Sequence, residues 1–398
     1  MNDLPLEPTA PDPRLGTADA ALLRPCADDP ARLEAYIPSP CVQNHAAQIV
    51  PLRDGSLGCV WFGGTEEGIP DISVYFSRLA SGADRWPDPV KLSDDGTRSE
   101  QNPLLFNAPN GELWLLHTAQ LGGNQDTALV RRRISTDDGR NWSAPDTMIE
   151  PGPGYGIFVR QPPVVTKDGL WLLPGFRCVT PVQGKWVGDA DISEVHVSAD
   201  AGRSWTSHIV PDSTGCVHMS IVPTDDGYAG FFRSRWADSI YVSRSDDGLT
   251  WSAPVPTELP NNNSSIQALA LADGRLAMVF NASSVADATG RRLGLYDDIG
   301  EEDDAPAATA EGRTAFWGAP RAPMTLALSE DGGHTWPIRR DLDVGDGFCM
   351  TNNSKDQLNR EYSYPSITQT SDGMLHIAYT YFRRAIKYVR VKPEWATN

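Results

Sequence analysis

The stretch Ser135-Thr136-Asp137-Asp138-Gly139-Arg140-Asn141-Trp142 contains an eight-residue frame, Ser-x-Asp-x-Gly-x-x-Trp, that returns later in the chain. Residues 198–205 and 329–336 reproduce this frame in full. Residues 244–251 keep all but the first position, where Arg244 replaces the serine, and a weaker copy ends at Trp86. The chain is therefore built from repeats.

The frame has the chemistry of a tight turn between two strands. An Asp side chain accepts hydrogen bonds from backbone N–H groups a few residues further on, and Gly supplies the positive φ that closes a turn. The Trp packs back under the strands. Each copy therefore predicts a hairpin between antiparallel strands, and we interpret its residues as turn and packing residues without a functional role.

A second motif, an Asx-Gly pair between two apolar segments, occurs six times. Asp54-Gly55 separates residues 46–52 from residues 57–62. The five further pairs are at residues 110–111, 168–169, 226–227, 273–274 and 372–373. Asn-Gly and Asp-Gly between strand-like segments are strong hairpin signals. Six hairpins indicate six repeats of about 60 residues each from Cys41 onward.

The eight-residue frame is the Asp-box, and its recurrence resembles the sialidase (neuraminidase) superfamily of BNR-repeat β-propellers. We therefore predict an all-β fold, a six-bladed β-propeller with Asp-box hairpins over residues 36–398, preceded by an arm or strap at residues 1–35. An acidic stretch at about residues 285–318 interrupts the pattern. We expect it to be a solvated loop inserted within a blade, able to cover the pocket or contact another subunit.

Composition excludes several classes of function. The formal net charge of −18 argues against a nucleic-acid partner. No apolar run reaches membrane-spanning length, and the first residues lack the features of a signal peptide, so we expect a soluble cytoplasmic protein; an upstream start would make it secreted. The six cysteines lack metal-binding spacing, and no cofactor or metal is expected. Assembly into a homo-oligomer is left open.

In a propeller the starts of the innermost strands converge on one face around the axis. Each predicted blade carries hydrogen-bonding side chains at this position. They are Asn44 and His45, Gln101 and Asn102, Arg160 and Gln161, His218, Asn262 and Asn263, and Glu361, Tyr362 and Tyr364. So many directional polar groups indicate a polyhydroxylated ligand, and the protein's expected partner is a carbohydrate substrate bearing an acidic sugar.

The resemblance also assigns roles. Sialidases use an Asp as general acid/base, a Tyr nucleophile assisted by a Glu, and three Arg that clamp the substrate carboxylate. Asp71, just before residues 72–78, stands where the acid/base would be, and Tyr364 in Tyr362-Ser363-Tyr364-Pro365 resembles the nucleophile. Arg233 and Arg321 resemble two of the clamp arginines.

Two positions depart from the sialidase pattern. Gln43-Asn44-His45-Ala46 stands where sialidases carry the first clamp Arg, and Val217-His218-Met219-Ser220 stands where they carry the Glu that assists Tyr. The chain more closely resembles bacterial sialidase-like BNR-repeat proteins, whose substrates are mostly unassigned. The shared motifs are Asn-His-Ala at residues 44–46, Trp-Phe-Gly-Gly-Thr-x-Glu-Gly at 61–68, Gly-Gly-Asn-Gln-Asp-Thr at 122–127 and Tyr-Ser-Tyr-Pro at 362–365.

Three functions follow from these residues. In a glycoside hydrolase, Asp71 protonates the leaving oxygen, and Tyr364, deprotonated toward His218 or Glu361, attacks the anomeric carbon. In a uronate lyase, His45, His218, Tyr364 and Arg160 share the carboxylate neutralisation and the proton abstraction. The third alternative is a non-catalytic carbohydrate-binding propeller. The predicted substrate-binding residues are His45, Asn102, Arg160, Gln161, Arg233, Asn262 and Arg321.

Other charged residues are expected to be structural. We interpret Arg383, Arg384 and Lys387 as a solvated edge strand, because charged residues commonly protect sheet edges. Glu66 and Glu67 are expected to be loop charges. The histidines within strand patterns are expected to be hydrogen-bonded blade residues; they are His117, His196 and His376.

Overall fold

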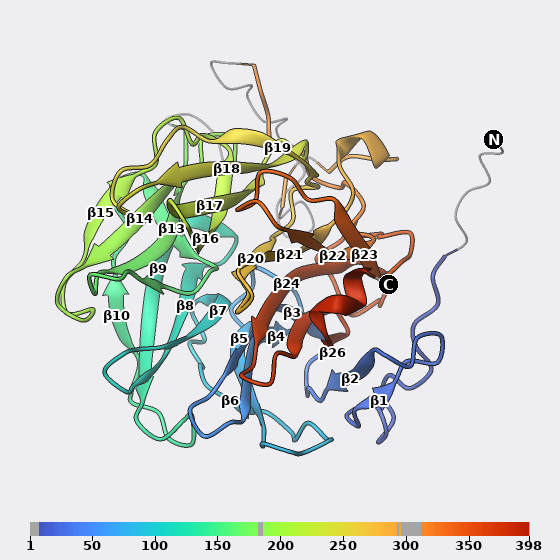
Figure 1. Cartoon of the computed structure of the whole chain (residues 1–398). Coiled ribbons are helices and arrows are strands. Elements are labelled where there is room, and N and C mark those ends of the chain that lie inside the picture. The colour runs from blue at the N-terminus through green and yellow to red at the C-terminus, as the bar shows by residue number, and fades with distance from the viewer. Residues whose placement is uncertain (1–7, 182–185, 293, 296–311, 398) are drawn as a thin grey trace.

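Six antiparallel sheets follow one another around a ring in the computed structural model (Figure 1). The structure describes residues 8–181, 186–292, 294–295 and 312–397. The predicted all-β fold, a six-bladed β-propeller, is confirmed.

Blades one to three are each formed by consecutive stretches of chain, with the innermost strand first. Blade one comprises β3 (Gln43–Pro51), β4 (Leu57–Gly64), β5 (Ser73–Leu79) and β6 (Val90–Lys91). Blade two comprises β7 (Ser99–Asn107), β8 (Leu113–Leu121), β9 (Asn124–Ser135) and β10 (Asp146–Ile149). Blade three comprises β11 (Tyr155–Val159), β12 (Val164–Val165), β13 (Trp171–Val179), β14 (Ile192–Ser198) and β15 (Thr206–Ile209).

Blades four and five repeat this order. Blade four comprises β16 (Cys216–Thr224), β17 (Gly227–Ser234), β18 (Ser239–Ser245) and β19 (Val255–Pro260). Blade five comprises β20 (Gln267–Ala270), β21 (Leu276–Asn281), β22 (Met324–Ser329) and β23 (Ile338–Asp343). Two short 3₁₀ helices are present among the described residues, η1 (Val285–Asp287) and η2 (Pro393–Thr397).

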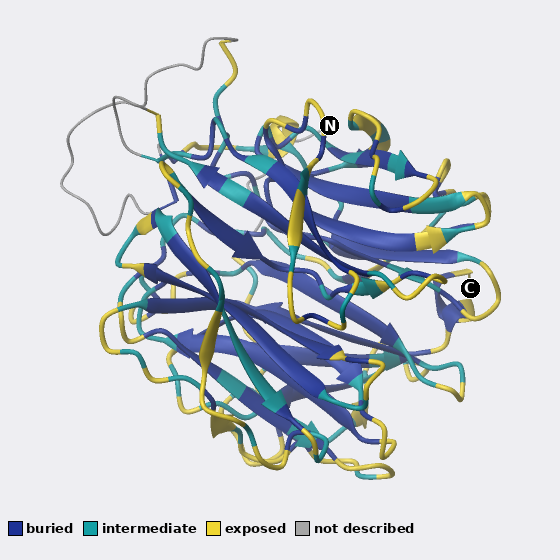
Figure 2. Cartoon of the chain, turned by 90° about the vertical axis from the view of Figure 1, so that its left-hand side faces the viewer, coloured by how far each residue is buried: buried dark blue, intermediate teal, exposed yellow. Residues whose placement is uncertain are grey.

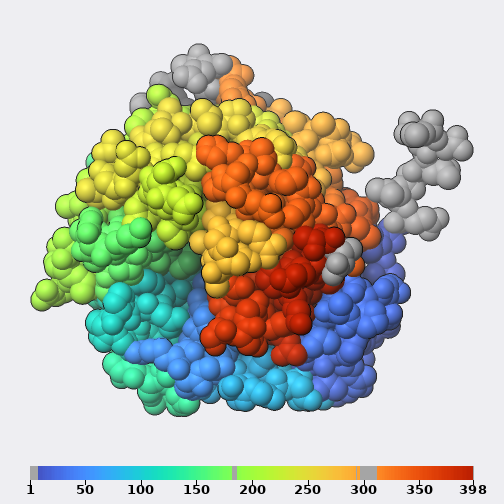
Figure 3. Space-filling view, viewed as in Figure 1, coloured from blue at the N-terminus to red at the C-terminus, as the bar shows by residue number. Residues whose placement is uncertain are grey.

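Blade six joins the two ends of the chain. Its strands β24 (Tyr362–Gln369), β25 (Leu375–Tyr381) and β26 (Ala385–Val391) are completed by β2 (Leu33–Ile37) and β1 (Arg24–Pro25). The N-terminal segment, blue, lies beside the red C-terminal blade in Figure 3. The domain boundary predicted between residues 35 and 36 therefore falls inside β2, because this strand pairs with β26.

Strand β2 also shows that the predicted solvated edge strand at residues 383–387 is not an edge. Since β2 pairs along β26, the latter has no open edge. Lys387 is buried, and its ammonium contacts Asp343 at 2.9 Å and Glu34 at 2.9 Å. The interpretation of Lys387 as a solvated edge residue is wrong, because its charge is neutralised inside the sheet junction.

The Asp-box turns connect the third and fourth strands of blades two to five. In the copy at residues 135–142, the amide of Gly139 donates to Ser135 Oγ at 2.9 Å, and Asn141 donates to Asp137 Oδ1 at 2.8 Å. In the copy of blade four the serine and the aspartate are Ser245 and Asp247, one residue later than in the predicted frame, whereas Gly248 and Trp251 keep their predicted places. There Ser245 accepts from Gly248 at 2.8 Å, so the serine is retained.

Polar side chains join the buried inner strands of neighbouring blades. Leu105 of β7 donates its amide to Gln48 of β3 at 2.8 Å, and Ile49 of β3 donates to Ser366 of β24 at 3.0 Å. Figure 2 shows the strands largely buried and the connecting loops exposed. These contacts satisfy backbone groups that water does not reach, and they fix each blade relative to the next.

The acidic segment is only partly described. The acidic residues predicted to form its solvated part, at positions 297–304, lie outside the described residues. In the part that the structure describes, Ala315 and Trp317 are each only 3% exposed, so this end is packed and not solvated as predicted. Among the described residues, no helix is long and apolar enough to cross a membrane.

The Asp-box glycine of blade three tests how the blades pack. A Cβ at Gly202 (φ 78°) would lie within 3.0 Å of ring carbons of Trp114 and Trp171, whereas a Cβ at Gly169 (φ 85°) would meet nothing. Both substitutions to Ala strain the backbone by about 1 kcal/mol. We expect Gly202→Ala to lower the free energy of unfolding by a further ~2 kcal/mol in urea titrations. Equal losses would contradict the packing role.

Candidate active site

The inner strands of five blades break their regular pairing, and blade five has a positive-φ residue just before its inner strand. In β3, β7, β16 and β24 the register shifts, and the residue there has a positive φ. These residues are Ala46 (58°), Asn102 (49°), His218 (55°) and Tyr364 (50°). In blade five Asn263 (57°) precedes β20, and in blade three the inner strand is interrupted between β11 and β12. Such bulges redirect side chains, here toward the axis.

Tyr364 is the centre of this arrangement. Its side chain is 5% exposed, and Arg233 Nη1 donates to its hydroxyl oxygen at 2.5 Å. The guanidinium carbons of Arg160, Arg233 and Arg321 lie 5.6, 5.6 and 5.7 Å from the centroid of its ring. Three arginines from different blades therefore surround one tyrosine, and two of them are the predicted clamp residues Arg233 and Arg321.

Hydrogen bonds to backbone carbonyls hold Arg160 in place, and a side-chain amide holds Arg233. Arg160 Nη2 donates to the carbonyls of Ala47 at 2.8 Å and Tyr364 at 3.1 Å, and Arg233 Nε donates to Asn263 Oδ1 at 2.8 Å. Burial lowers the pKa of both Arg160 and Arg233 to about 10. Both guanidiniums remain positive at neutral pH, and the site favours an anionic ligand.

Two imidazoles flank the tyrosine. The ring of His45 lies 4.3 Å from that of Tyr364, and the ring of His218 lies 5.6 Å from it, measured between centroids. Burial, reinforced by the neighbouring arginines, holds the pKa of each histidine well below its usual value. Both imidazoles are therefore neutral at neutral pH.

Glu361 belongs to a buried chain of ion pairs. Its carboxylate contacts Arg321 Nη1 at 3.3 Å and Arg383 Nε at 2.8 Å, and Arg383 Nη1 contacts Glu67 at 2.6 Å. Burial opposes ionisation of Glu361, but Arg383 and Arg321 outweigh it and lower its pKa. Glu361 is therefore a carboxylate held by two arginines.

The interpretations of Arg383 as a solvated edge residue and of Glu67 as a loop charge are wrong. Both side chains are at most 4% exposed, because the turn after β25 folds inward to Glu361. The sequence contains a pattern that could have indicated the buried position of Arg383. Phe231-Phe232-Arg233 and Tyr381-Phe382-Arg383 place an arginine after an aromatic pair at the end of the second strand of their blades.

Three other predicted site residues, Gln161, Asn262 and Asp71, make hydrogen bonds with groups other than Tyr364. Gln161 donates to the carbonyl of Ile266 at 2.6 Å, and Asn262 donates to that of Pro320 at 2.8 Å. Asp71 is exposed in the loop between β4 and β5, where Thr65 donates to its carboxylate. Its neighbour Ile72 packs in the same hydrophobic cluster as Tyr364.

Two of the three strand histidines, His117 and His376, have the hydrogen bonds predicted for them, and His196 lies beside a carboxylate. His117 lies 3.0 Å from Glu100, His196 lies 3.1 Å from Glu194, and His376 lies 2.7 Å from the hydroxyl of Tyr388. Within the described part of the chain, no group of three or more His, Cys, Asp or Glu side chains is placed to hold a metal ion.

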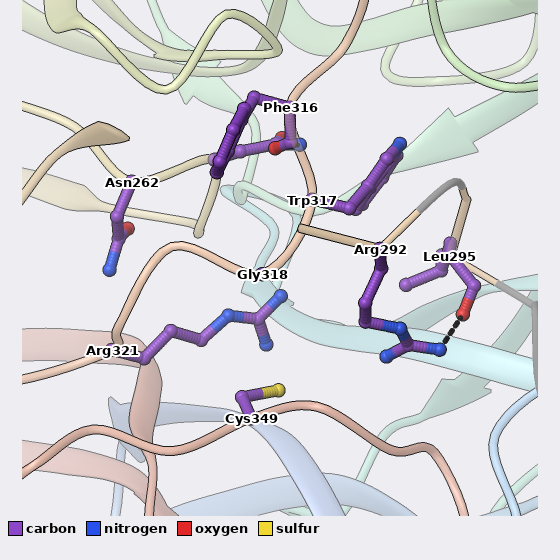
Figure 4. Close-up of a pocket in the computed structure, with 9 residues that line it drawn as sticks. Asn262, Arg292, Leu295, Phe316, Trp317, Gly318, Arg321 and Cys349 are labelled. Atoms are coloured by element: carbon purple, nitrogen blue, oxygen red, sulfur yellow. Dashed lines mark hydrogen bonds between the residues drawn. The ribbon is translucent and has the colours of Figure 1, made fainter. Parts of the chain in front are cut away.

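A small pocket is lined in part by Arg292 and Arg321 (Figure 4). Its lining includes Asn262, Arg321 and Cys349, with Phe316 and Trp317 from the end of the acidic segment. In Figure 4 the guanidinium of Arg321 points into the space between Gly318 and Cys349. Cys349, Phe316 and Trp317 were not among the predicted site residues, because nothing in their local pattern places them at the axis.

A six-bladed ring with Asp-box turns and a cationic site around a tyrosine defines a BNR-type propeller. Residues 55–377 match the family model described as BNR repeat-like domain. The chain belongs to this family. No curated protein matches the chain in sequence.

Solved structures share the fold at low sequence identity. "Hadza microbial sialidase Hz136" is 15% identical with a TM-score of 0.66; the match covers 89% of this chain and 66% of that one. A protein of unknown function from Dyadobacter fermentans is 15% identical with a TM-score of 0.65, covering 91% of this chain and 99% of that one. The intramolecular trans-sialidase from Ruminococcus gnavus is 12% identical with a TM-score of 0.63, covering 88% and 94%. The chain has the sialidase-like propeller fold.

Arg383 and its neighbour Arg384 form a matched pair for testing the buried ion pairs. Arg383→Gln leaves Glu361 and Glu67 buried without their shared cation, and we expect the free energy of unfolding to fall by about 3–5 kcal/mol at pH 7. Arg384 is partly exposed, and Arg384→Gln is expected to cost less than about 1 kcal/mol.

The same loss is expected to depend on pH. The lowered pKa of Glu361 contributes stability above its ordinary value near 4.5, and this contribution disappears as the pH falls through the lowered value. The penalty of Arg383→Gln should therefore shrink below pH 4.5 in denaturant titrations. A penalty that is the same at pH 7 and in acid would contradict an ionised Glu361.

Proposed function

We propose that the protein is a sialidase-like glycoside hydrolase acting on a glycan or glycoside that bears an acidic sugar. The observation that carries this proposal is the buried Tyr364 surrounded by Arg160, Arg233 and Arg321, with Arg233 bonded to its hydroxyl oxygen. A cationic pocket around a potential oxygen nucleophile suits a negatively charged sugar.

The proposed first step forms a bond between Tyr364 Oη and the anomeric carbon. The bond from that carbon to the leaving oxygen breaks, and Asp71 supplies the proton that the leaving oxygen needs. In the second step water replaces the tyrosine, with Asp71 taking the proton from the water. An aryl oxide nucleophile avoids placing a second carboxylate against an anionic sugar.

The substrate carboxylate is proposed to bind Arg233 and Arg321. Among the described residues, Arg233 Nη2 is buried and has no hydrogen-bond partner, and Arg321 lines the pocket. A buried donor without a partner costs free energy, and a ligand carboxylate would remove that cost. The net positive charge would also neutralise the substrate's own charge on binding.

The neutral histidines are the proposed acceptors of the Tyr364 proton. Glu361, the other acceptor considered, is already bound to Arg321 and Arg383. His218 Nδ1 has no hydrogen-bond partner in the described part of the chain. We therefore assign this proton to His218 in preference to Glu361.

The same histidines favour a second candidate, a uronate lyase. A neutral imidazole can take the proton from the carbon next to the carboxylate, the electron pair forms a carbon–carbon double bond, and the glycosidic oxygen leaves as an alcohol after protonation. His45 and His218 both flank Tyr364, and Arg160, Arg233 and Arg321 would stabilise the developing negative charge.

Incubation with a panel of sialosides and uronosides distinguishes the candidates. We expect new reducing ends without the near-ultraviolet absorbance of an unsaturated uronate. Absorbance would establish the lyase instead. If neither reducing ends nor absorbance appear, and calorimetry shows that the same sugars bind, the protein is not an enzyme for these sugars, and the result supports a carbohydrate-binding propeller.

Substitutions test the roles of two residues in whichever turnover is found. We expect Asp71→Asn and Tyr364→Phe each to lower kcat/KM by about 10²-fold or more, because each removes a reacting group. Matched controls are Asp168→Asn in a hairpin turn and Tyr155→Phe in β11, which should retain activity. Full activity of both site variants would make the site assignment wrong.

A further inference from the structure

The described end of the acidic segment is fastened over the axial site. The amide of Phe316 donates to the carbonyl of Arg235 at 2.8 Å, and Asn263 Nδ2 donates to the carbonyl of Phe316 at 2.9 Å. The amide of Ala315 donates to Asp189 Oδ1 at 2.6 Å. This segment, an insertion between β21 and β22 of blade five, is thus bound to the loops of blades three and four.

Trp317 is the residue of this segment that packs against Arg233 and Arg235. Its ring lies 5.6 Å from the guanidinium carbon of Arg233 and 5.1 Å from that of Arg235, and its Nε1 donates to the carbonyl of Val187 at 3.1 Å. Cation–π contacts of this kind are stabilising, more so when buried. The indole therefore covers Arg233, which binds the hydroxyl of Tyr364.

This cover leaves little access to the reacting groups. Tyr364 is 5% exposed, Arg233 1% and Arg321 6%. A glycoside cannot bring its anomeric carbon to Tyr364 Oη while these side chains are so enclosed, so part of the surrounding wall has to move. The segment is held by hydrogen bonds, by cation–π contacts and by the ion pair of Arg313 with Asp238, without a continuous strand pairing. Such a segment opens more readily than strands paired within a blade.

The two ends of the segment permit such a movement. Gly312 has a φ of 72° and Gly318 a φ of 98°, and a Cβ at Gly312 would meet nothing within 4 Å. Hinges are a few loop positions that absorb changes in φ and ψ. Phe316 and Trp317 lie between these glycines, so rotation there would move the indole away from Arg233 as a unit.

We propose that residues 312–318 form a lid, latched by Trp317 against Arg233 and Arg235, that withdraws to admit an acidic glycoside and closes over it. The proposal rests on the proposed function in that a ligand must reach Tyr364. Trp317 then selects among ligands, because the lid closes only over a sugar that leaves room for the indole.

The thiol of Cys349 reports the opening without any substrate. It is 6% exposed and lines the pocket beneath Gly318. Burial raises its pKa, so alkylation is best followed with N-ethylmaleimide at pH 8.5, with the modified peptides quantified by mass spectrometry. Cys59 and Cys216, buried elsewhere in the ring, report any loosening of the whole fold.

The variants are Trp317→Ala, Trp317→Phe and, as a matched control, Trp205→Ala. Trp205 is a half-buried Asp-box residue of the rim, remote from the site. We expect Trp317→Ala to raise the alkylation rate of Cys349 about tenfold or more, because both cation–π contacts and the hydrogen bond to Val187 are lost. Trp317→Phe should raise it less, and Trp205→Ala should leave it unchanged.

An unchanged rate at Cys349 in a folded Trp317→Ala variant would overturn the lid. If Cys59 and Cys216 also react faster, Trp317→Ala has loosened the whole fold, and a second variant is needed. Asp189→Ala serves this purpose, because it retains the indole of Trp317 and removes the acceptor of the Ala315 amide. A faster reaction at Cys349 alone then supports the lid, and no change overturns it. Since alkylation needs no turnover, this result is independent of whether the protein proves to be a hydrolase.

Discussion

A backbone in the left-handed region is maintained at the axial bulge of four inner strands, at Ala46, Asn102, His218 and Tyr364. For residues other than glycine this conformation costs about 1–2 kcal/mol each, so it persists only where the surroundings enforce it. The hydrogen bonds between inner strands and the pairing of β2 with β26 supply that constraint. The site around Tyr364 therefore depends on closure of the whole ring.

The charge inside the ring is opposite to that of the whole protein. Four buried arginines, at positions 160, 233, 321 and 383, face two buried glutamates, Glu67 and Glu361, and both nearby histidines are neutral. The site therefore carries an excess of positive charge within a chain whose formal net charge is −18. An anion entering the axis meets cations that the low-dielectric interior does not screen, whereas the acidic surface repels it elsewhere.

Local sequence was sufficient for the fold and for much of the site. Turn residues such as Gly55 and Gly139 act through their own backbone, so six hairpins and the Asp-boxes could be predicted from short motifs. Arg383 and Lys387 could not, because the strand that buries Lys387 comes from residues 33–37 at the other end of the chain. Trp317 follows an irregular insertion, and only the folded ring shows that it lies over Arg233. Contacts between distant segments leave no periodic signal in one sequence.

A crystal structure of the protein with a bound acidic glycoside would test whether the bulged inner strands form one anion-binding site around Tyr364. The Asp71→Asn variant is suited to such a complex because the ligand should remain uncleaved. We expect the carboxylate of the sugar to bind Arg233 and Arg321, with the anomeric carbon facing Tyr364 Oη. A sugar bound on the outer rim or beside the N-terminal strands, with the axial site empty, would contradict it.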